Sequence, residues 1–376
     1  MIAMHPLLSG ISSITFSHIA MIAIGCILIA LAIRKQYEPM LLLPIGFGAI
    51  LANIPGSAAI SETGFLTALY NFGIENELFP ILIFIAVGAM IDFSPLLTQP
   101  VTLFFGAAAQ FGIFFAMLLA VLVNYICPEM FSLKEAAAIG IIGAADGPTS
   151  IYVGRLFAPK YLAAITVAAY SYMALVPIIQ PPVIRLLTSR RERLIRMDTV
   201  MQTRVPRKVR ILFPLCVTAI AGILAPESTA LIGSLMFGNL IRECGVLERL
   251  SLAAQNELSN LVTLLLGITI GSTMQAETFL TVQTAFIMGI GLLAFAFDTA
   301  GGVLAAKLAN LFLKQKINPM IGACGISAFP MSARIIQKMA QEEDSQNIIL
   351  MPAVGANVSG QIGSIIAGAM LLNLLG

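Results

Sequence analysis

The sequence predicts an all-α protein that crosses a membrane many times. Three observations predict it: the composition, the length of the apolar runs and the placement of the basic residues. Of the 376 residues, 58% are hydrophobic and only 11% are charged, and the mean hydropathy is +0.94. Soluble domains carry about 25% charged residues, so this composition excludes an ordinary soluble protein. Apolar runs of about 20 residues, which span a bilayer as helices, recur along the whole chain.

The apolar runs are expected to form ten crossings and two interrupted segments. The crossings are predicted at 17–33, 39–54, 78–91, 101–126, 161–187, 211–224, 230–240, 258–274, 285–306 and 348–376. Arg34-Lys35 closes the first run, and Pro55-Gly56 ends the second. The interrupted segments are 133–157 and 318–336, in which glycine and proline deny a continuous helix. Ser132 and Glu135 predict a capping box at the start of the first of these.

A basic linker divides the chain into two halves. Nine basic residues lie between 185 and 210: Arg185, Arg190, Arg191, Arg193, Arg196, Arg204, Arg207, Lys208 and Arg210. Such a cluster marks the cytoplasmic side, and an ordinary positive-inside anchor is favoured over a dedicated lipid site. We therefore expect a first transmembrane repeat at 1–187, a linker at 188–210 and a second repeat at 211–376.

The two halves are predicted to be related by an inverted repeat. Asn76-Glu77-Leu78 and Asn256-Glu257-Leu258 open corresponding segments, 180 positions apart. If both interrupted segments are re-entrant, each half crosses five times, so the second half is inverted. With the linker inside, the acidic 56–77 loop falls outside, and the two hairpins enter from opposite faces.

Asp146 is the first candidate for chemistry, because it lies between helix-breaking residues inside apolar sequence. A charge at membrane depth is expensive, and an unwound backbone beside an acid is how transporters build cation sites. The alternative is a buried carboxylate satisfied by backbone amides at a helix start. Handling of a cation or a proton is the favoured interpretation.

The second hairpin supplies further candidates. Gly322 and nearby breakers would expose carbonyl groups to a hard cation such as Na⁺, together with oxygens of Asn318 and Ser327. The alternative is a plain kink packed against neighbouring helices. Arg334 would either anchor the segment at the interface or hold a carboxylate. Asn357 places an amide in the middle of the last segment, which packing of its flanking glycines does not explain.

Two other residues are left with open roles. Tyr172 is either a phenol at hydrogen-bonding depth or an interfacial aromatic residue. Asp298 is a second acid within an apolar segment, which would either act with Asp146 or line a separate cavity. The five cysteines form no CxxC pair and the two histidines lie near the start, so neither a disulfide frame nor a His-based metal site is expected. No signal-peptide cleavage site is recognised, so the N-terminal segment is expected to be retained.

At these residues the chain resembles the β subunit of the sodium-pumping, biotin-dependent decarboxylases, which act on oxaloacetate, methylmalonyl-CoA, glutaconyl-CoA or malonate. The runs that carry the resemblance, in order, are Gly140–Thr149, Ala168–Pro177, Gln180–Pro182, Lys316–Gly322, Ser327–Arg334 and Gly355–Asn357. The resemblance covers essentially the whole chain. The short loop before residue 78 differs from the oxaloacetate forms and favours the acyl-CoA systems.

The resemblance implies that this chain decarboxylates carboxybiotin and exports Na⁺ from the cytoplasm, with consumption of a proton. It implies catalytic roles for Asp146, Tyr172 and Arg334, and carboxybiotin binding by Arg334 and Ser327. The Na⁺ ligands that it implies are Asp146, Asn318, Gly322, Ser327 and Asn357.

The resemblance also implies an elevator-type fold in a bacterial or archaeal cytoplasmic membrane. The implied assembly is a homotrimer with a carboxyltransferase α subunit, a biotin carrier that supplies carboxybiotin, and a small γ or δ membrane subunit. No nucleic-acid partner is expected. The alternative function is a stand-alone secondary transporter, either a Na⁺-coupled carboxylate carrier or a Na⁺/H⁺ antiporter.

Overall fold

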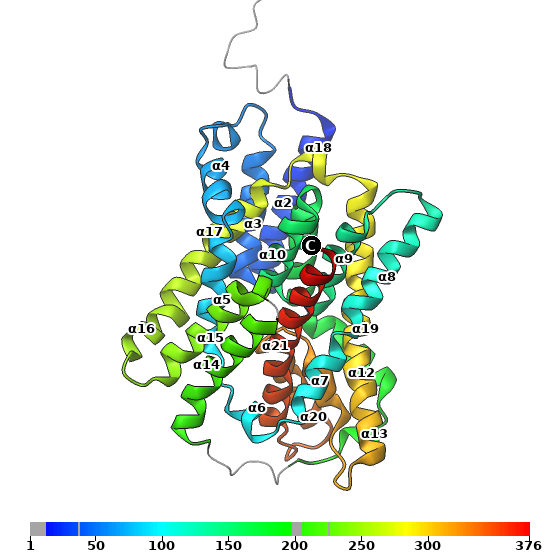
Figure 1. Ribbon diagram of the computed structural model, residues 1–376. Helices are drawn as coiled ribbons and strands as arrows, with labels where there is room; N and C mark the ends of the chain where they lie inside the picture. The colour runs from blue at the N-terminus through cyan, green and yellow to red at the C-terminus, as the bar shows by residue number, and fades with distance from the viewer. Residues whose placement is uncertain (1–12, 37, 198–204, 225) are drawn as a thin grey trace, which may run out of the picture.

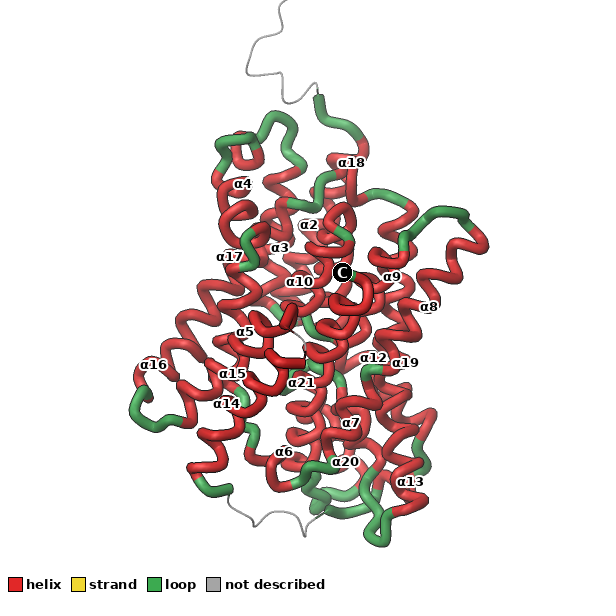
Figure 2. Tube along the Cα trace, viewed as in Figure 1, coloured by secondary structure: helices red, strands yellow, loops and turns green. Residues whose placement is uncertain are grey.

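The computed structural model describes residues 13–36, 38–197, 205–224 and 226–376. The protein is 81% helical, and the part of the chain just defined contains no strand (Figure 2). The prediction of an all-α protein is confirmed. His5 and Arg204 lie outside the described residues.

The first half of the chain forms α2 to α12. Its elements are α2 (Phe16–Lys35), α3 (Pro39–Ala52), η2 (Ala58–Ile60), α4 (Phe65–Leu69), η3 (Tyr70–Glu75), α5 (Leu78–Met90), α6 (Ser94–Thr98), α7 (Thr102–Ala109), α8 (Phe111–Ile126), α9 (Leu133–Gly140), η4 (Ile141–Ala144), α10 (Gly147–Phe157), η5 (Pro159–Tyr161), α11 (Leu162–Ala174) and α12 (Val176–Leu187).

The linker and the second half form α13 to α21. Their elements are α13 (Arg190–Arg193), α14 (Arg207–Leu224), η7 (Pro226–Ser228), α15 (Thr229–Glu243), α16 (Glu248–Ala253), η8 (Ala254–Leu258), α17 (Ser259–Ser272), α18 (Ala276–Phe279), α19 (Val282–Phe312), η9 (Pro319–Gly325), α20 (Met331–Glu343) and α21 (Leu350–Leu375).

Four helical stretches are long and apolar enough to cross a membrane: Phe16–Lys35, Thr102–Ile126, Val282–Phe312 and Leu350–Leu375. Two pairs of helices, bent by 61° and 66°, raise the number of candidate spans to six. Several of the ten predicted crossings form shorter helices; α3 and α17 have 14 residues each, about 21 Å at 1.5 Å per residue. The expected span at 101–126 is interrupted at Gln110, between α7 and α8.

The elements gather at two opposite ends of the molecule. The segments around α4 and α18 lie at one end, and α6, α13 and α20 lie at the other (Figure 1). The basic α13 therefore shares an end with α20, the helix that follows the second interrupted segment.

Two helix pairs pack so closely that only glycine fits between them. In the α3–α17 pair, a Cβ atom added to Gly48 or Gly271 would lie 2.3 or 2.1 Å from a carbonyl oxygen of the other helix. In the α5–α15 pair, the same atom on Gly88 or Gly238 would lie 1.9 or 2.0 Å from such an oxygen. Small residues at helix contacts are what membrane helices use to approach closely.

In each helix pair, an asparagine side chain donates a hydrogen bond to a carbonyl group just after the partner helix. Asn53, after α3, donates hydrogen bonds of 2.8 Å to Ala49 and 2.7 Å to Met274, which follows α17. Asn239 of α15 donates a hydrogen bond of 2.9 Å to Ile91, which follows α5. Both asparagines are buried and satisfy carbonyl groups left free at helix ends.

Candidate functional site

The first interrupted segment breaks at Asp146, as the sequence predicts. The chain passes from α9 into the 3₁₀ turn η4, and Ala145 then adopts a left-handed backbone with a φ of 52°. Asp146 is extended and forms the N-cap of α10, whose first turn contains Pro148. The predicted capping box between Ser132 and Glu135 is also present at the start of α9.

The Asp146 carboxylate faces the protein interior. Its Oδ2 atom accepts hydrogen bonds of 2.7 Å from the Thr149 hydroxyl and 2.7 Å from the Ser364 hydroxyl. Its Oδ1 atom receives a longer one of 3.5 Å from the Thr149 amide. The alternative role considered from the sequence, a carboxylate that accepts from a backbone amide at a helix start, is thus present in part. Within the described ranges, no basic side chain forms an ion pair with it, so its charge is balanced only by dipoles.

The two interrupted segments meet at their breaks. The second hairpin consists of η9, a non-helical stretch from residue 326 to 330, and α20. The Ser327 amide donates a hydrogen bond of 3.0 Å to the carbonyl of Ala144, two residues before Asp146. The structure therefore brings Ser327 next to the break that carries Asp146.

Asn357 of α21 lies against the second break. It is fully buried, and its Nδ2 atom donates hydrogen bonds of 2.7 Å to Ile326 and 3.2 Å to Cys324. Among the described residues its Oδ1 atom accepts no hydrogen bond. A buried oxygen without a partner costs about 1–3 kcal/mol and calls for an explanation such as an ion or a water. The Ser327 hydroxyl donates a hydrogen bond of 2.9 Å to Gly360 of the same helix.

Three glutamine side chains support the second break, and sequence reasoning missed them. Gln180 of α12 donates a hydrogen bond of 2.9 Å to Ala323, and Gln110, between α7 and α8, donates one of 3.3 Å to Gly325. Gln361 of α21 donates to the carbonyl of Ser327. Ser364 was missed as well. The available signal was the same in each case, a polar side chain inside an apolar segment.

Two predicted residues lie in packing positions away from Asp146. A Cβ atom on Gly322 would lie 2.0 Å from the Gly302 carbonyl oxygen, so this glycine allows η9 to touch α19. The Tyr172 hydroxyl donates a hydrogen bond to Met288 of α19. The aromatic ring beside the acid belongs instead to Tyr170, whose ring carbon Cζ would lie 2.1 Å from a Cβ atom on Gly147.

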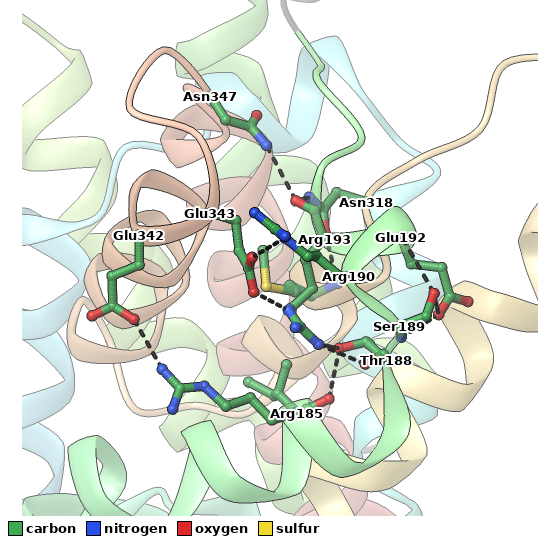
Figure 3. Close-up of polar contacts among 12 residues, drawn as sticks. Arg185, Thr188, Ser189, Arg190, Glu192, Arg193, Asn318, Glu342, Glu343 and Asn347 are labelled. Atoms are coloured by element: carbon green, nitrogen blue, oxygen red, sulfur yellow. Dashed lines mark hydrogen bonds and ion pairs between the residues drawn. The ribbon is translucent and has the colours of Figure 1, made fainter.

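Asn318 lies at the other end of η9 and binds the linker. Its Nδ2 atom donates hydrogen bonds of 2.8 Å to Arg193 and 3.0 Å to Ile195, and its Oδ1 atom accepts one of 3.1 Å from Met320. Asn347, before α21, reaches the same two carbonyl groups (Figure 3). Asn318 is thus the N-cap of η9 and a contact to the linker, and its recorded bonds do not reach Asp146.

Ion pairs join the end of α12 and the linker to the end of α20, and Figure 3 shows those made by Arg185, Arg190 and Arg193. The partners are Arg185 with Glu342 at 3.0 Å, Arg193 with Glu343 at 2.7 Å, Arg190 with Glu343 at 3.2 Å and Arg196 with Asp344 at 2.6 Å. The hydrogen bond from Arg193 lowers the pKa of Glu343, and that from Arg196 lowers the pKa of Asp344. We call these four pairs the linker clamp.

Arg334 lies in the first turn of α20 with an exposed side chain. Its guanidinium makes no recorded hydrogen bond or ion pair with any described residue. It is therefore available to a ligand from the end of the molecule that carries α13 and α20.

The polar groups at the two breaks are mainly oxygen atoms. No group of three or more His, Cys, Asp and Glu side chains gathers among residues 13–36, 38–197, 205–224 and 226–376. The breaks instead offer one carboxylate, one unpartnered amide oxygen, hydroxyl groups and backbone carbonyl groups. Oxygen atoms of these kinds are the ligands that hard cations prefer.

Comparison with known proteins gives one family over nearly the whole chain. The model of the Na⁺-transporting oxaloacetate decarboxylase beta subunit matches residues 17–375. Among curated proteins, the chain is 49% identical to glutaconyl-CoA decarboxylase subunit beta of Acidaminococcus fermentans, over 98% of this chain and 96% of the relative. It is 43% identical to methylmalonyl-CoA decarboxylase subunit beta of Propionigenium modestum, covering 98% and 97%. It is 45% identical to oxaloacetate decarboxylase beta chain 2 of Salmonella typhimurium, covering 94% of both.

The linker clamp predicts a pH-dependent contribution to stability. We expect Glu343→Gln to lower the thermal unfolding midpoint of the purified protein by a few degrees at neutral pH. Because Arg193 lowers the pKa of Glu343 in the folded state, the contribution is present above the unfolded value of about 4.3 and is lost as pH falls below it. The difference from wild type should therefore vanish under acidic conditions.

The matched control is Glu342→Gln, which removes a more exposed pair, with side chains 60% and 47% exposed. It should have the smaller effect, because solvent screens exposed pairs. An equal midpoint for Glu343→Gln and wild type at neutral pH would contradict a stabilising clamp.

Proposed function

This chain belongs to the family of Na⁺-transporting oxaloacetate decarboxylase beta subunits, and from that premise we propose that it decarboxylates carboxybiotin and exports Na⁺ from the cytoplasm. The observation that carries the proposal is the contact between the two breaks beside a buried, uncompensated carboxylate. Membrane transporters build ion sites where discontinuous helices from two repeats meet.

The proposed architecture is a pair of inverted repeats, 1–187 and 211–376, working as an elevator-type transporter. The reciprocal helix pairs support it. Under the internal match, α5 corresponds to α17, and α3 corresponds to α15. Exchanging the two repeats therefore converts the α3–α17 pair into the α15–α5 pair. The glycine contacts and the two buried asparagines recur in both pairs, as a two-fold relation requires.

Na⁺ is proposed to bind between the breaks. Asp146 would supply the charge, and Ser327 and Asn357 would supply neutral oxygens, with the free Oδ1 atom of Asn357 as the strongest support. Asn318 and Gly322 belong to the same proposed set, and their contacts support positional roles: Asn318 fixes the start of η9 to the linker, and Gly322 seats η9 on α19. Tyr172 would act at the contact between α11 and α19.

Carboxybiotin is proposed to enter from the basic end. Arg334 would bind the carboxylate of carboxybiotin through a bidentate hydrogen bond, and Ser327, further inside the same hairpin, would also contact carboxybiotin. Decarboxylation breaks the bond between the biotin nitrogen and the carboxylate carbon, releases CO₂ and leaves a nitrogen that takes up a proton. A proton reaching Asp146 would neutralise the acid and remove its attraction for Na⁺. That proton would then pass to the biotin nitrogen, which restores the Asp146 carboxylate and couples release of Na⁺ to consumption of one proton.

The partners and the location follow from the family role. We propose a homotrimer in a bacterial or archaeal cytoplasmic membrane, joined by a carboxyltransferase α subunit, a biotin carrier and a small γ or δ subunit. The compound that the whole complex decarboxylates is proposed to be an acyl-CoA. The alignments with the glutaconyl-CoA and methylmalonyl-CoA relatives span 368 and 392 positions, whereas that with the oxaloacetate relative spans 407. The extra positions support insertions in the oxaloacetate form.

The alternative is a stand-alone secondary transporter, and biotin distinguishes the two. In vesicles containing the complete complex, Na⁺ uptake should require the decarboxylase substrate and should stop when avidin binds the biotin. Vesicles that contain this chain alone should show no flux along a pH gradient. Avidin-resistant Na⁺ flux by the lone chain would favour the carrier.

Asp146→Asn should abolish Na⁺-dependent decarboxylation while leaving membrane insertion intact. Loss of a charged contact to the ion, worth about 3 kcal/mol, corresponds to a rate decrease on the order of a hundredfold. The measurement is decarboxylation at increasing Na⁺ concentration. The control is Asp92→Asn, which should retain the wild-type response; Asp92 follows α5, and its Oδ1 atom accepts a hydrogen bond of 2.8 Å from the Ser94 amide. Wild-type Na⁺ stimulation in the Asp146 variant would remove this residue from the site.

Arg334→Lys should turn over carboxybiotin about ten times more slowly, since lysine cannot replace a two-pronged contact and the lost hydrogen bond is worth about 1.5 kcal/mol. The rate of decarboxylation of free carboxybiotin measures this effect. Lys338→Arg, an exposed change one turn further along α20, serves as the control. An unchanged rate with lysine at position 334 would argue against carboxylate binding by the guanidinium.

A further inference from the structure

Asp298 is a second buried acid that the proposed Na⁺ site does not use. It lies near the middle of the 31-residue α19 and is completely buried. Neither carboxylate oxygen has a hydrogen-bond partner of ordinary geometry among the described residues. The Gly112 amide approaches the carboxyl group without making such a bond. A carboxyl group so placed needs a physical account, because buried polar atoms are nearly always paired.

Two glycines make the space that the carboxyl group occupies. A Cβ atom on Gly112 would lie 2.1 Å from Oδ1, and a Cβ atom on Gly143 would lie 3.2 Å from Oδ2. Gly112 follows the break between α7 and α8, and Gly143 belongs to η4 in the first hairpin. The carboxyl group is therefore held in a cradle between α19, the α7–α8 break and the hairpin that carries Asp146.

No basic side chain pairs with this acid. On α19 and the helical elements packed against it, the titratable or charged described groups are Lys307, Tyr125, Lys134, Glu135, Tyr170, Tyr172, Arg185 and Cys324. The recorded contacts of the cations are elsewhere: Lys307 pairs with Glu192, Arg185 pairs with Glu342, and Lys134 lies over the Phe157 ring. An ionised carboxylate without a partner is far more expensive to bury than a neutral acid.

The neighbouring oxygens favour a proton over a metal cation as the neutralising ligand. A sodium ion would need several oxygen ligands around it. One backbone oxygen beside the carboxyl group is the Ala294 carbonyl, which would lie 2.6 Å from a Cβ atom on Gly112, and no group of three or more His, Cys, Asp and Glu side chains gathers among the described residues. Ala294 precedes Asp298 by four residues, one helical turn, so a protonated carboxyl group can donate back to that carbonyl. The stacked rings of Phe115 and Phe297, 3.9 Å apart, pack α8 against α19 nearby.

We propose that Asp298 is a reversible proton-binding site, protonated in the packed arrangement and loosening the cradle when it releases the proton. The released carboxylate would have to recruit water or separate η4 from α19, and η4 leads directly into Asp146. The site would thereby link a proton to the position of the first hairpin. The coupling to transport rests on the function proposed above, whereas the protonation itself does not.

The first test is infrared spectroscopy of the purified complex at neutral pH without substrate. Wild type should show the carbonyl stretch of a protonated carboxyl group, shifted in D₂O and missing from the Asp298→Asn spectrum. Asp298→Glu should retain a shifted band, which keeps the test decisive if the asparagine variant fails to assemble. Absence of the band in wild type would overturn the proposal, and so would loss of the band on addition of NaCl at constant pH, because Na⁺ would then be the ligand.

The second test separates a reversible proton from a permanent one. Asp298→Asn should slow Na⁺-dependent decarboxylation about a hundredfold, the usual contribution of a positioned proton-transfer group, and should flatten its pH profile. Asp92→Asn should keep the wild-type profile. A wild-type rate and profile in Asp298→Asn would overturn reversible binding. The infrared band is measured without turnover, so it tests the protonation of Asp298 even if the proposed pumping function is wrong.

Discussion

The hydrogen bond from the Ser327 amide to the Ala144 carbonyl is the contact on which the arrangement depends. A backbone that leaves its helix inside a membrane exposes donors and acceptors that no solvent can satisfy. Two such breaks in one molecule can satisfy each other only if they face each other. The first break supplies a free carbonyl and the second a free amide, so the two hairpins stabilise each other at this contact.

The remaining groups at the breaks are satisfied by amide side chains from three other elements. Gln110, Gln180 and Asn357 each donate to a carbonyl of residues 323–326. These donors leave the opposite ends of two side chains unpartnered, the Oε1 atom of Gln110 and the Oδ1 atom of Asn357. Donor groups thus face the backbone, while two acceptor oxygens remain buried without a partner near the second break. That imbalance is what a cation would correct.

Local chemistry decided which parts of the site were predictable from the sequence. Gly147 and Pro148 forbid a continuous helix, so the break at Asp146 was predictable, as was the capping box of Ser132 and Glu135. Ser364 lies 218 positions from Asp146, and nothing local announces that its hydroxyl reaches the acid. The segment 101–126 was predicted as one continuous span because Gln110 is not a helix breaker. The interruption at Gln110 is seen only in the structure. Asn318 was singled out from its motif, but the motif did not reveal that its side chain contacts the linker.

The contacts of Asn318 also explain how the two ends of the second hairpin can communicate. One end of the seven-residue η9 is tied through Asn318 to the carbonyls of Arg193 and Ile195, and its other end supplies the carbonyls that face Asn357. Arg193 is in turn held by Glu343 at the end of α20, so the clamp fixes the hairpin at both its entry and its exit. A displacement of the linker must therefore either break these bonds or move η9, and moving η9 moves the oxygens at the break. Chemistry at the basic end could therefore affect the proposed ion site through these bonds, without any group moving from one to the other.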